Sequence, residues 1–227
     1  ANQKRLGIMP ANAQLTEWPD TLPKWDSLGE VEKKLFIRQM DVYAAYLAYT
    51  DHEIGRVIQA GEDMGQLDNT LIIYISGDNG ASAEGMVNGT PNEFTTMNGV
   101  PVPVKAQYLW YPFWGSEKTF PHYAAPWAWA MSTPFKWVKQ VASHFGGTKQ
   151  GVAMSWPGHI KDVGGVRSQF HHIIDIAPTI LEAAGIPTVV VGSARDIVEQ
   201  CGVPRFLFTD FPLGNPCGAP YAAETQR

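Results

Sequence analysis

The clearest hydrophobic pattern in the chain is an unbroken run over Leu71–Ile75, in which every residue is apolar or aromatic and most are β-branched. A run without polar alternation is typical of a strand that is covered on both faces of a mostly parallel sheet. Residues 151–156 form a second short apolar segment, which ends at Pro157-Gly158 and predicts another buried strand. Together with the helices expected around them, these strands indicate an α/β fold with a mostly parallel sheet flanked by helices.

A long amphipathic helix is predicted upstream of the first strand. It should begin around Ser27, with Glu30 three residues later at the spacing of a capping box, and end near Gly65. The apolar positions that follow a 3.6-residue period are Leu35, Phe36, Tyr43, Tyr46, Leu47, Ile54, Val57 and Ile58. This helix leads almost directly into the Leu71–Ile75 strand.

The region 81–131 is the least regular part of the chain and is rich in glycine and proline. Many of its aromatic rings gather between residues 108 and 129, which favours a packed loop over disorder. The rings could form a local core or line one wall of a substrate pocket. Both interpretations stay open, and different rings could serve each.

The last predicted elements follow residue 170. A helix is expected from Asp175 to Ala184, with Asp175 as N-cap and Gly185 as C-cap. Beyond it, residues 188–191, 194–200 and 206–208 read as a strand, a helix and a strand.

Some polar residues admit both a metal-binding and a structural interpretation. Asp51, His52 and Glu53 lie together in the long helix, where a solvated face is the simpler interpretation. His171 and His172 precede the 175–184 helix. Because neighbouring side chains diverge, at most one of this pair should point towards any site, and a structural role is the simpler expectation.

The polar residues with the best-placed chemistry are Asp78 and Asn79, which directly follow the first strand. In open α/β sheets, ligands bind at the carboxyl ends of the strands. A carboxylate beside a carboxamide offers oxygen ligands that suit a hard cation such as Ca²⁺ or Mg²⁺. The alternative is that Asp78-Asn79-Gly80 merely forms a turn.

The amino-acid composition limits the kinds of partner that the chain is expected to bind. The chain has 227 residues, of which 44% are hydrophobic and 17% charged, enough apolar material for one large α/β domain. A net charge of −5 argues against nucleic acid as the main partner. No apolar run approaches the roughly 20 residues that span a bilayer, and no signal peptide is recognised. Two cysteines, Cys201 and Cys217, make neither a disulfide framework nor a zinc site. The cellular compartment stays open.

Beyond these patterns, several segments, taken in order along the chain, resemble the sulfatases, specifically the bacterial arylsulfatases of the alkaline-phosphatase superfamily. The resemblance covers about residues 5–187. The segments that carry it are Thr50–Arg56, Leu67–Ala81, Asn88–Thr90, Thr133–Trp137, His144–Thr148, Ser155–Pro157 and Asp175–Ile180.

The resemblance implies a sulfuric ester hydrolase that acts on a small-molecule sulfate ester. Such enzymes use a formylglycine beside a divalent cation, usually Ca²⁺, with Mg²⁺ also possible. Carried over by position, Asp78 and Asn79 would be metal ligands, and Lys139 would be the catalytic and substrate-binding lysine that contacts the sulfate. Lys136 is the neighbouring candidate, but its spacing fits less well.

Part of the family pattern is missing from this sequence. The Cys-x-Pro-x-Arg motif that yields the formylglycine is absent, and Cys201–Arg205 imitates it with its proline one position late. We therefore expect an incomplete sulfatase-like domain over residues 1–187. Residues 188–227 form a divergent tail, weakly similar to proteins related to the glycine reductase complex, which suggests a fusion. The alternatives to an arylsulfatase fragment are a catalytically inactive metal-binding α/β protein or a phosphoryl-transfer relative.

Overall fold

A computed structural model describes residues 2–167, 169 and 171–186 of the chain. The chain divides into two units, residues 1–166 and 167–227. The strand, helix and strand expected after residue 187, together with Cys201 and Cys217, lie outside the described residues, so these expectations stay predictions.

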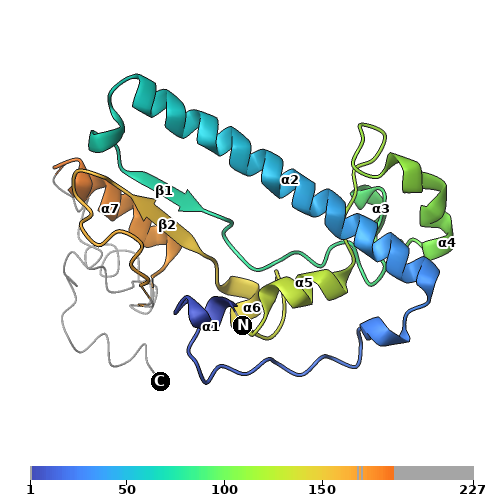
Figure 1. Cartoon of the computed structure of the whole chain (residues 1–227). Helices are drawn as coiled ribbons and strands as arrows, with labels where there is room; N and C mark the ends of the chain where they lie inside the picture. Colours follow the sequence, from blue (N-terminus) through green and yellow to red (C-terminus); the bar gives the residue numbers. More distant parts are fainter. Residues whose placement is uncertain (1, 168, 170, 187–227) are drawn as a thin grey trace, which may run out of the picture. The chain divides into compact units, whose positions relative to one another are not determined.

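The first unit is built along one long helix, α2 (Glu30–Asp63), which Figure 1 shows as a single uninterrupted rod. It begins later than the capping-box spacing suggested. Ser27 ends a short 3-10 helix, η1 (Trp25–Ser27), and its hydroxyl donates to the carbonyl oxygen of Lys24 at 2.7 Å. Gly29 is the N-cap, and its backbone N–H donates to the Glu32 carboxylate at 2.8 Å. The capping interaction that the sequence spacing predicted is therefore present, but it lies two residues later than expected because the 3-10 turn precedes it.

The polar residues within α2 behave as a solvated face. Asp51 and His52 are exposed, and Glu53 forms an ion pair with Arg56 one turn later. None of the helices in the described part of the chain combines the length and the apolar character needed to cross a lipid bilayer.

The main core lies against the first turns of α2. Leu35 and Phe36 are buried with Trp114 and Ala124, and several rings of the aromatic region pack around them. The indole N–H of Trp127 donates to the carbonyl oxygen of Phe36 at 3.1 Å. The core interpretation of the aromatic region is therefore confirmed for the rings that surround this cluster, which are Tyr108, Tyr111, Trp114 and Trp127. The short elements of this region are α3 (Glu93–Met97), α4 (Val104–Gln107), η3 (Tyr108–Phe113) and α5 (Ala125–Ser132).

A buried glutamine links α2 to this irregular region. Gln39 is only 1% exposed, and its side chain serves two segments at once. Its Nε2 donates to the carbonyl oxygen of Asn88 at 2.8 Å, and its Oε1 accepts from the backbone N–H of Ala124 at 2.9 Å. Gln107, also fully buried, donates to the carbonyl oxygens of Asn88 and Gly89. Two amide side chains thus supply the hydrogen bonds that regular structure would otherwise provide.

The sheet of the described residues differs from the expected one. Strands β1 (Ile72–Ile75) and β2 (Val152–Ser155) form a two-stranded antiparallel sheet in which Ile72 pairs with Ser155 and Ile75 with Val152. Both strands lie where the apolar runs predicted them. A mostly parallel sheet is not found among the described residues, and burial on both faces is wrong for them, since Tyr74 is 44% exposed and every β2 residue is exposed. An apolar run specifies that a strand has partners but does not specify their direction.

Short helices flank the two strands along the sequence. Helix η2 (Leu67–Asn69) joins α2 to β1, and α6 (Phe145–Thr148) precedes β2. Helix α1 (Asn2–Arg5) begins the first unit.

The described part of the second unit contains η4 (Ile173–Asp175) and α7 (Ile176–Ala183). Asp175 is the N-cap of α7, as expected, but its carboxylate accepts from the backbone N–H of His172 at 2.8 Å. The Nδ1 of His172 accepts in turn from the N–H of Ile174 at 3.2 Å. His172 therefore has the structural role that we expected. Gly185 follows the helix with φ +65°, where its backbone N–H donates to the carbonyl oxygen of Glu182.

We predict that Gln39→Ala lowers the free energy of unfolding by about 1–3 kcal/mol, because the buried N–H of Ala124 loses its acceptor. Gln59→Ala is the matched control. Gln59 lies on the same helix, is exposed, and bonds only to Glu62 and Asp63. Its unfolding free energy should change by less than about 0.5 kcal/mol. Urea unfolding followed by circular dichroism measures both; equal effects would contradict a special role for Gln39.

Candidate functional site

Asp78 and Asn79 lie in the loop that leaves β1, as the sequence predicted. Asp78 is exposed and Asn79 is partly buried. The next residue, Gly80, is buried, and its backbone N–H donates to the carbonyl oxygen of Gly147 at 2.9 Å. A Cβ placed on Gly80 would lie 1.7 Å from the carbonyl oxygen of Gly146. Only glycine permits this approach, so the loop that carries Asp78 and Asn79 is pinned to the Gly146-Gly147 turn.

Lys139 lies next to the same loop. Its backbone N–H donates to the carbonyl oxygen of Ala81, two residues beyond Asn79, at 3.0 Å. Its Nζ forms an ion pair with the Oε2 of Glu84 at 3.0 Å, with the two side chains 34% and 27% exposed. The structure therefore brings Lys139 to the segment that follows Asp78 and Asn79.

Lys136, the competing lysine, is placed differently. Its side chain is exposed, and the described contacts of this residue come from its backbone, whose carbonyl oxygen accepts from the N–H of Gly146 at 3.0 Å. Sequence spacing could not show the environments of the two lysines. In the structure, Lys139 is partly buried and paired with Glu84, whereas the side chain of Lys136 is exposed.

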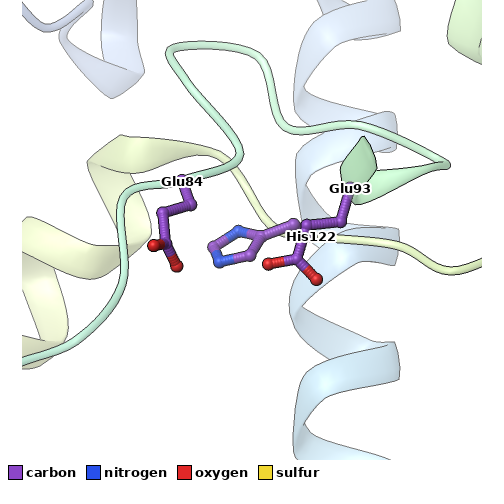
Figure 2. Close-up of side chains that lie close together, drawn as sticks. All are labelled: Glu84, Glu93 and His122. Atoms are coloured by element: carbon purple, nitrogen blue, oxygen red, sulfur yellow. The ribbon is translucent and has the colours of Figure 1, made fainter. Parts of the chain in front are cut away.

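Glu84, the partner of Lys139, lies near two further side chains that can bind metals. The ligand atoms of Glu84, Glu93 and His122 all lie within 4.8 Å of one another, and each residue is partly buried (Figure 2). Among the described residues this trio is a second possible metal-binding group, separate from Asp78 and Asn79.

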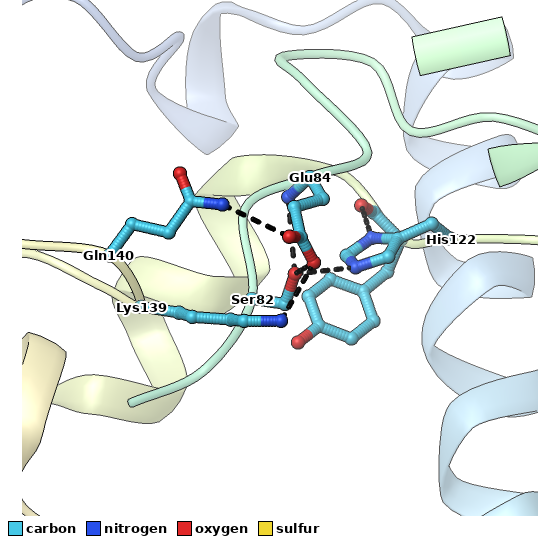
Figure 3. Close-up of polar contacts among 6 residues, drawn as sticks. Ser82, Glu84, His122, Lys139 and Gln140 are labelled. Atoms are coloured by element: carbon cyan, nitrogen blue, oxygen red, sulfur yellow. Dashed lines mark hydrogen bonds and ion pairs between the residues drawn. The ribbon is translucent and has the colours of Figure 1, made fainter. Parts of the chain in front are cut away.

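A hydrogen-bond network centres on the Glu84 carboxylate (Figure 3). Its Oε2 accepts from the hydroxyl of Ser82 at 2.7 Å and from Lys139, and its Oε1 accepts from the Nε2 of Gln140 at 3.0 Å. The Ser82 Oγ also lies 2.8 Å from the Nε2 of His122. The network therefore joins the 81–92 loop to residues 139–140 and to the segment before α5.

These contacts make Glu84 a better acid than an ordinary glutamic acid. The hydrogen bond from Ser82 lowers the pKa of Glu84 most, and the hydrogen bond and charge of Lys139 lower it further, while partial burial opposes them. Burial raises the pKa of the neighbouring Tyr123 to about 12, so that its phenol stays neutral. Lys139 therefore faces an ionised carboxylate at neutral pH.

The sequence interpretation missed Ser82, Glu84 and His122. Ser82 and Glu84 lie only three and five residues beyond Asn79, within a segment that shows no periodic pattern, and His122 is 38 residues further along than Glu84. The Gly85 backbone packs directly on His122, since a Cβ there would lie 2.7 Å from its Nδ1. This close approach explains the glycine, but it becomes recognisable only once the two segments are seen together.

An apolar pocket of about 410 Å³ begins at the residue after Glu84. Residues 85–89, Pro101, Val102 and Ala125 line it. It could receive an apolar part of a ligand beside the polar network.

Comparison with known proteins identifies the family. The family model described as Sulfatase matches residues 9–186. An uncharacterized sulfatase of Schizosaccharomyces pombe is 35% identical over 192 residues, which is 82% of this chain and 32% of that protein. An arylsulfatase of Klebsiella aerogenes is 29% identical over 205 residues, or 89% of this chain and 41% of that protein. The chain thus spans 32% and 41% of the length of these two relatives.

The lowered pKa of Glu84 predicts a pH-dependent contribution to stability. The carboxylate stabilises the fold above the ordinary glutamate value of 4.5, and this contribution disappears as the pH falls through the lower folded-state pKa. Glu84→Gln should therefore unfold at lower urea concentration than the parent at pH 7, with the difference shrinking as the pH is lowered below about 4.5.

The control for this prediction is Glu117→Gln, at an exposed position. We expect no pH-dependent difference from the parent there. A deficit in Glu84→Gln that stays constant from pH 7 to the acid range would show that the ionised carboxylate, with its bonds to Ser82 and Lys139, is not its cause.

Proposed function

The chain belongs to the sulfatase family, and we propose that it forms the part of an arylsulfatase that holds one side of the divalent cation and contacts the sulfate through Lys139. The family match over residues 9–186 and the name of the bacterial relative support this reaction class. Because the chain covers less than half of either relative, hydrolysis is proposed for the protein that contains the whole catalytic domain.

One observation carries the proposal: Lys139 is bonded to the segment immediately beyond Asp78 and Asn79. A hydrolase of sulfate esters needs positive charge on several sides of the sulfuryl group, because negative charge spreads over its oxygens in the transition state. A lysine whose backbone is hydrogen-bonded to an oxygen-rich loop is suited to that task. In Lys136, by contrast, the side chain is exposed.

Asp78 and Asn79 have the donor chemistry of a Ca²⁺ or Mg²⁺ site, since both offer side-chain oxygens. Neither side chain takes part in the hydrogen bonds and ion pairs identified within the described residues, so both are available to a ligand. Two ligands are too few for Ca²⁺, which takes roughly six to eight oxygens, so other groups must complete the site. When bound, a divalent cation supplies Lewis acidity to the ester oxygens.

Lys139 would act on the ester itself. An ammonium group has three N–H donors, and Glu84 takes one of them among the described contacts. The others remain for the sulfate and for the oxygen of the leaving group, whose developing charge they would stabilise. The ionised Glu84 keeps the ammonium directed, which limits the reorganisation required when the ester binds.

The motif that supplies the family's formylglycine nucleophile is absent from the sequence. The substrate class proposed is an aryl sulfate, with the apolar pocket beside Glu84 as a place for the aryl group.

The proposal predicts that substitutions of Asp78 and of Lys139 have different effects on metal binding and activity. In the polypeptide that joins this chain to the nucleophile motif, Asp78→Ala should lose both bound metal and hydrolysis of nitrophenyl sulfate. Lys139→Ala should keep the metal and lower kcat by roughly 10²-fold or more, as expected for one preorganised donor. Metal content by atomic absorption and steady-state kinetics measure the two effects.

Lys136→Ala is the matched control and should keep near-normal kcat. A normal kcat in Lys139→Ala together with a large defect in Lys136→Ala would reverse the assignment. Preferential hydrolysis of nitrophenyl phosphate would favour a phosphoryl-transfer relative, and metal binding without turnover of either ester would favour an inactive metal-binding protein.

A second prediction concerns the 227-residue chain by itself. Because Asp78 and Asn79 supply only two ligands, Ca²⁺ should bind weakly, with water in most coordination positions. Isothermal calorimetry measures the affinity. Tight Ca²⁺ binding that persists in Asp78→Ala would mean that the proposed ligands are wrong.

A further inference from the structure

The trio of Glu84, Glu93 and His122 combines two carboxylates and an imidazole from three separate segments (Figure 2). Glu84 belongs to the loop after β1, Glu93 is the first residue of α3, and His122 precedes α5. With ligand atoms no more than 4.8 Å apart, a single ion placed among them could reach all three. Neither Asp78 nor Asn79 belongs to this group.

Backbone pairing holds two of the three residues in place. Thr90 and His122 exchange hydrogen bonds at 2.8 and 2.9 Å, and the N–H of Glu93 donates to the carbonyl oxygen of Phe120 at 2.8 Å. The trio therefore does not depend on flexible loops meeting by chance. This preorganisation is what a metal site needs from its scaffold.

The tautomer of His122 follows from its neighbours. Its Nδ1 lies 2.9 Å from the carbonyl oxygen of Tyr123, which can only accept, so Nδ1 carries a proton. In the neutral ring Nε2 is then the basic nitrogen, and it faces the side of Ser82 and Glu84. Metal-binding histidines are commonly oriented in this way, with one ring N–H on a backbone carbonyl and the other nitrogen free to bind.

The hydroxyl next to this nitrogen lies between two groups that can both accept its hydrogen. The hydroxyl of Ser82 lies 2.7 Å from the Oε2 of Glu84 and 2.8 Å from the Nε2 of His122. Both of these atoms are acceptors when Glu84 is ionised and His122 neutral, and a hydroxyl has one hydrogen to give. The geometry is satisfied when one more positive species, a proton or a metal ion, lies at Nε2.

The two carboxylates favour a metal ion as that species. Glu84 accepts three hydrogen bonds, which leaves one of about four lone-pair positions. The carboxylate of Glu93 takes part in none of the hydrogen bonds and ion pairs identified within the described residues. With a neutral imidazole, Glu84, Glu93 and Lys139 together carry a net charge of −1. A proton on Nε2 would balance this charge but would leave the Glu93 carboxylate without a partner.

We propose that Glu84, Glu93 and the Nε2 of His122 form a binding site for a divalent transition metal, Zn²⁺ or Mn²⁺. Imidazole nitrogen with carboxylate oxygen suits these ions, whereas Ca²⁺ prefers oxygen ligands alone. The ion would displace the Ser82 hydroxyl from Nε2 and would join the loop after β1, α3 and the segment before α5. Its ligands are distinct from Asp78, Asn79 and Lys139, although Glu84 also forms the ion pair with Lys139.

Titration calorimetry of the purified 227-residue chain with ZnCl₂ and MnCl₂ at pH 7.5 tests this proposal. We expect one equivalent of Zn²⁺ or Mn²⁺ that Ca²⁺ in excess does not displace. His122→Gln and Glu93→Gln should each weaken that equivalent by at least about tenfold, since changes to groups that only support a ligand already cost 10- to 100-fold. Asp78→Asn, which alters the proposed family site, is the control and should leave this equivalent unchanged.

Three outcomes would overturn the proposal. Binding that is unchanged in both His122→Gln and Glu93→Gln would mean adventitious binding elsewhere, and binding lost in Asp78→Asn would assign the ion to the other site. Absence of the equivalent in the parent chain would mean that the three residues do not form a metal site. Circular dichroism checks that the variants are folded; if His122→Gln is not, Glu93→Gln decides, because its carboxylate has no described partner in the metal-free protein.

Discussion

The close contact between Gly80 and the Gly146-Gly147 turn is the constraint on which the candidate site depends. A Cβ on Gly80 would strike the carbonyl oxygen of Gly146, and a Cβ on Gly146 would in turn lie 2.0 Å from the carbonyl oxygen of Trp137, so both positions need glycine. This contact brings residues 136–147 against the loop after β1. The bond from Lys139 to Ala81 follows from it, and the ion pair with Glu84 follows in turn. Gly80, Gly146 and Gly147 thus position Lys139 through backbone contacts alone.

Sequence patterns predicted those features that depend on neighbours along the chain. The apolar period of α2, the apolar runs of β1 and β2, and the cap residues of α7 are all local, and each element lies close to its expected position. The start of α2 was predicted too early because a 3-10 turn at Ser27 resembles the first turn of a helix in its polar spacing.

Pairing direction and the polar network could not be predicted in this way. β1 and β2 are about 80 residues apart, and nothing in either run distinguishes an antiparallel partner from a parallel one. Glu84 and His122 carry no periodic signal, and Gln39, although it lies on the apolar face of α2 with Leu35 and Phe36, is of a polar type for which a solvated side chain is the ordinary expectation. Their partners come from distant segments, so that burial of Gln39 and the pairing of Glu84 emerge only with the fold. Asp78 and Asn79 were recognised from their place directly after β1 and then through the family resemblance, Lys139 through the resemblance alone, and their chemical roles stay predictions.

The two proposed cation sites differ in their chemistry, although residues of both lie between Asp78 and Glu93. At the start of this segment, Asp78 and Asn79 offer only oxygen, which favours a hard ion that exchanges its water readily. At its end, Glu84 and Glu93 meet an imidazole, which favours a transition metal. Glu84 lies between the two, because the same carboxylate that faces His122 also directs Lys139. Glu84 is therefore shared between the two proposed sites, because it is a proposed ligand of the transition metal and also the partner of Lys139.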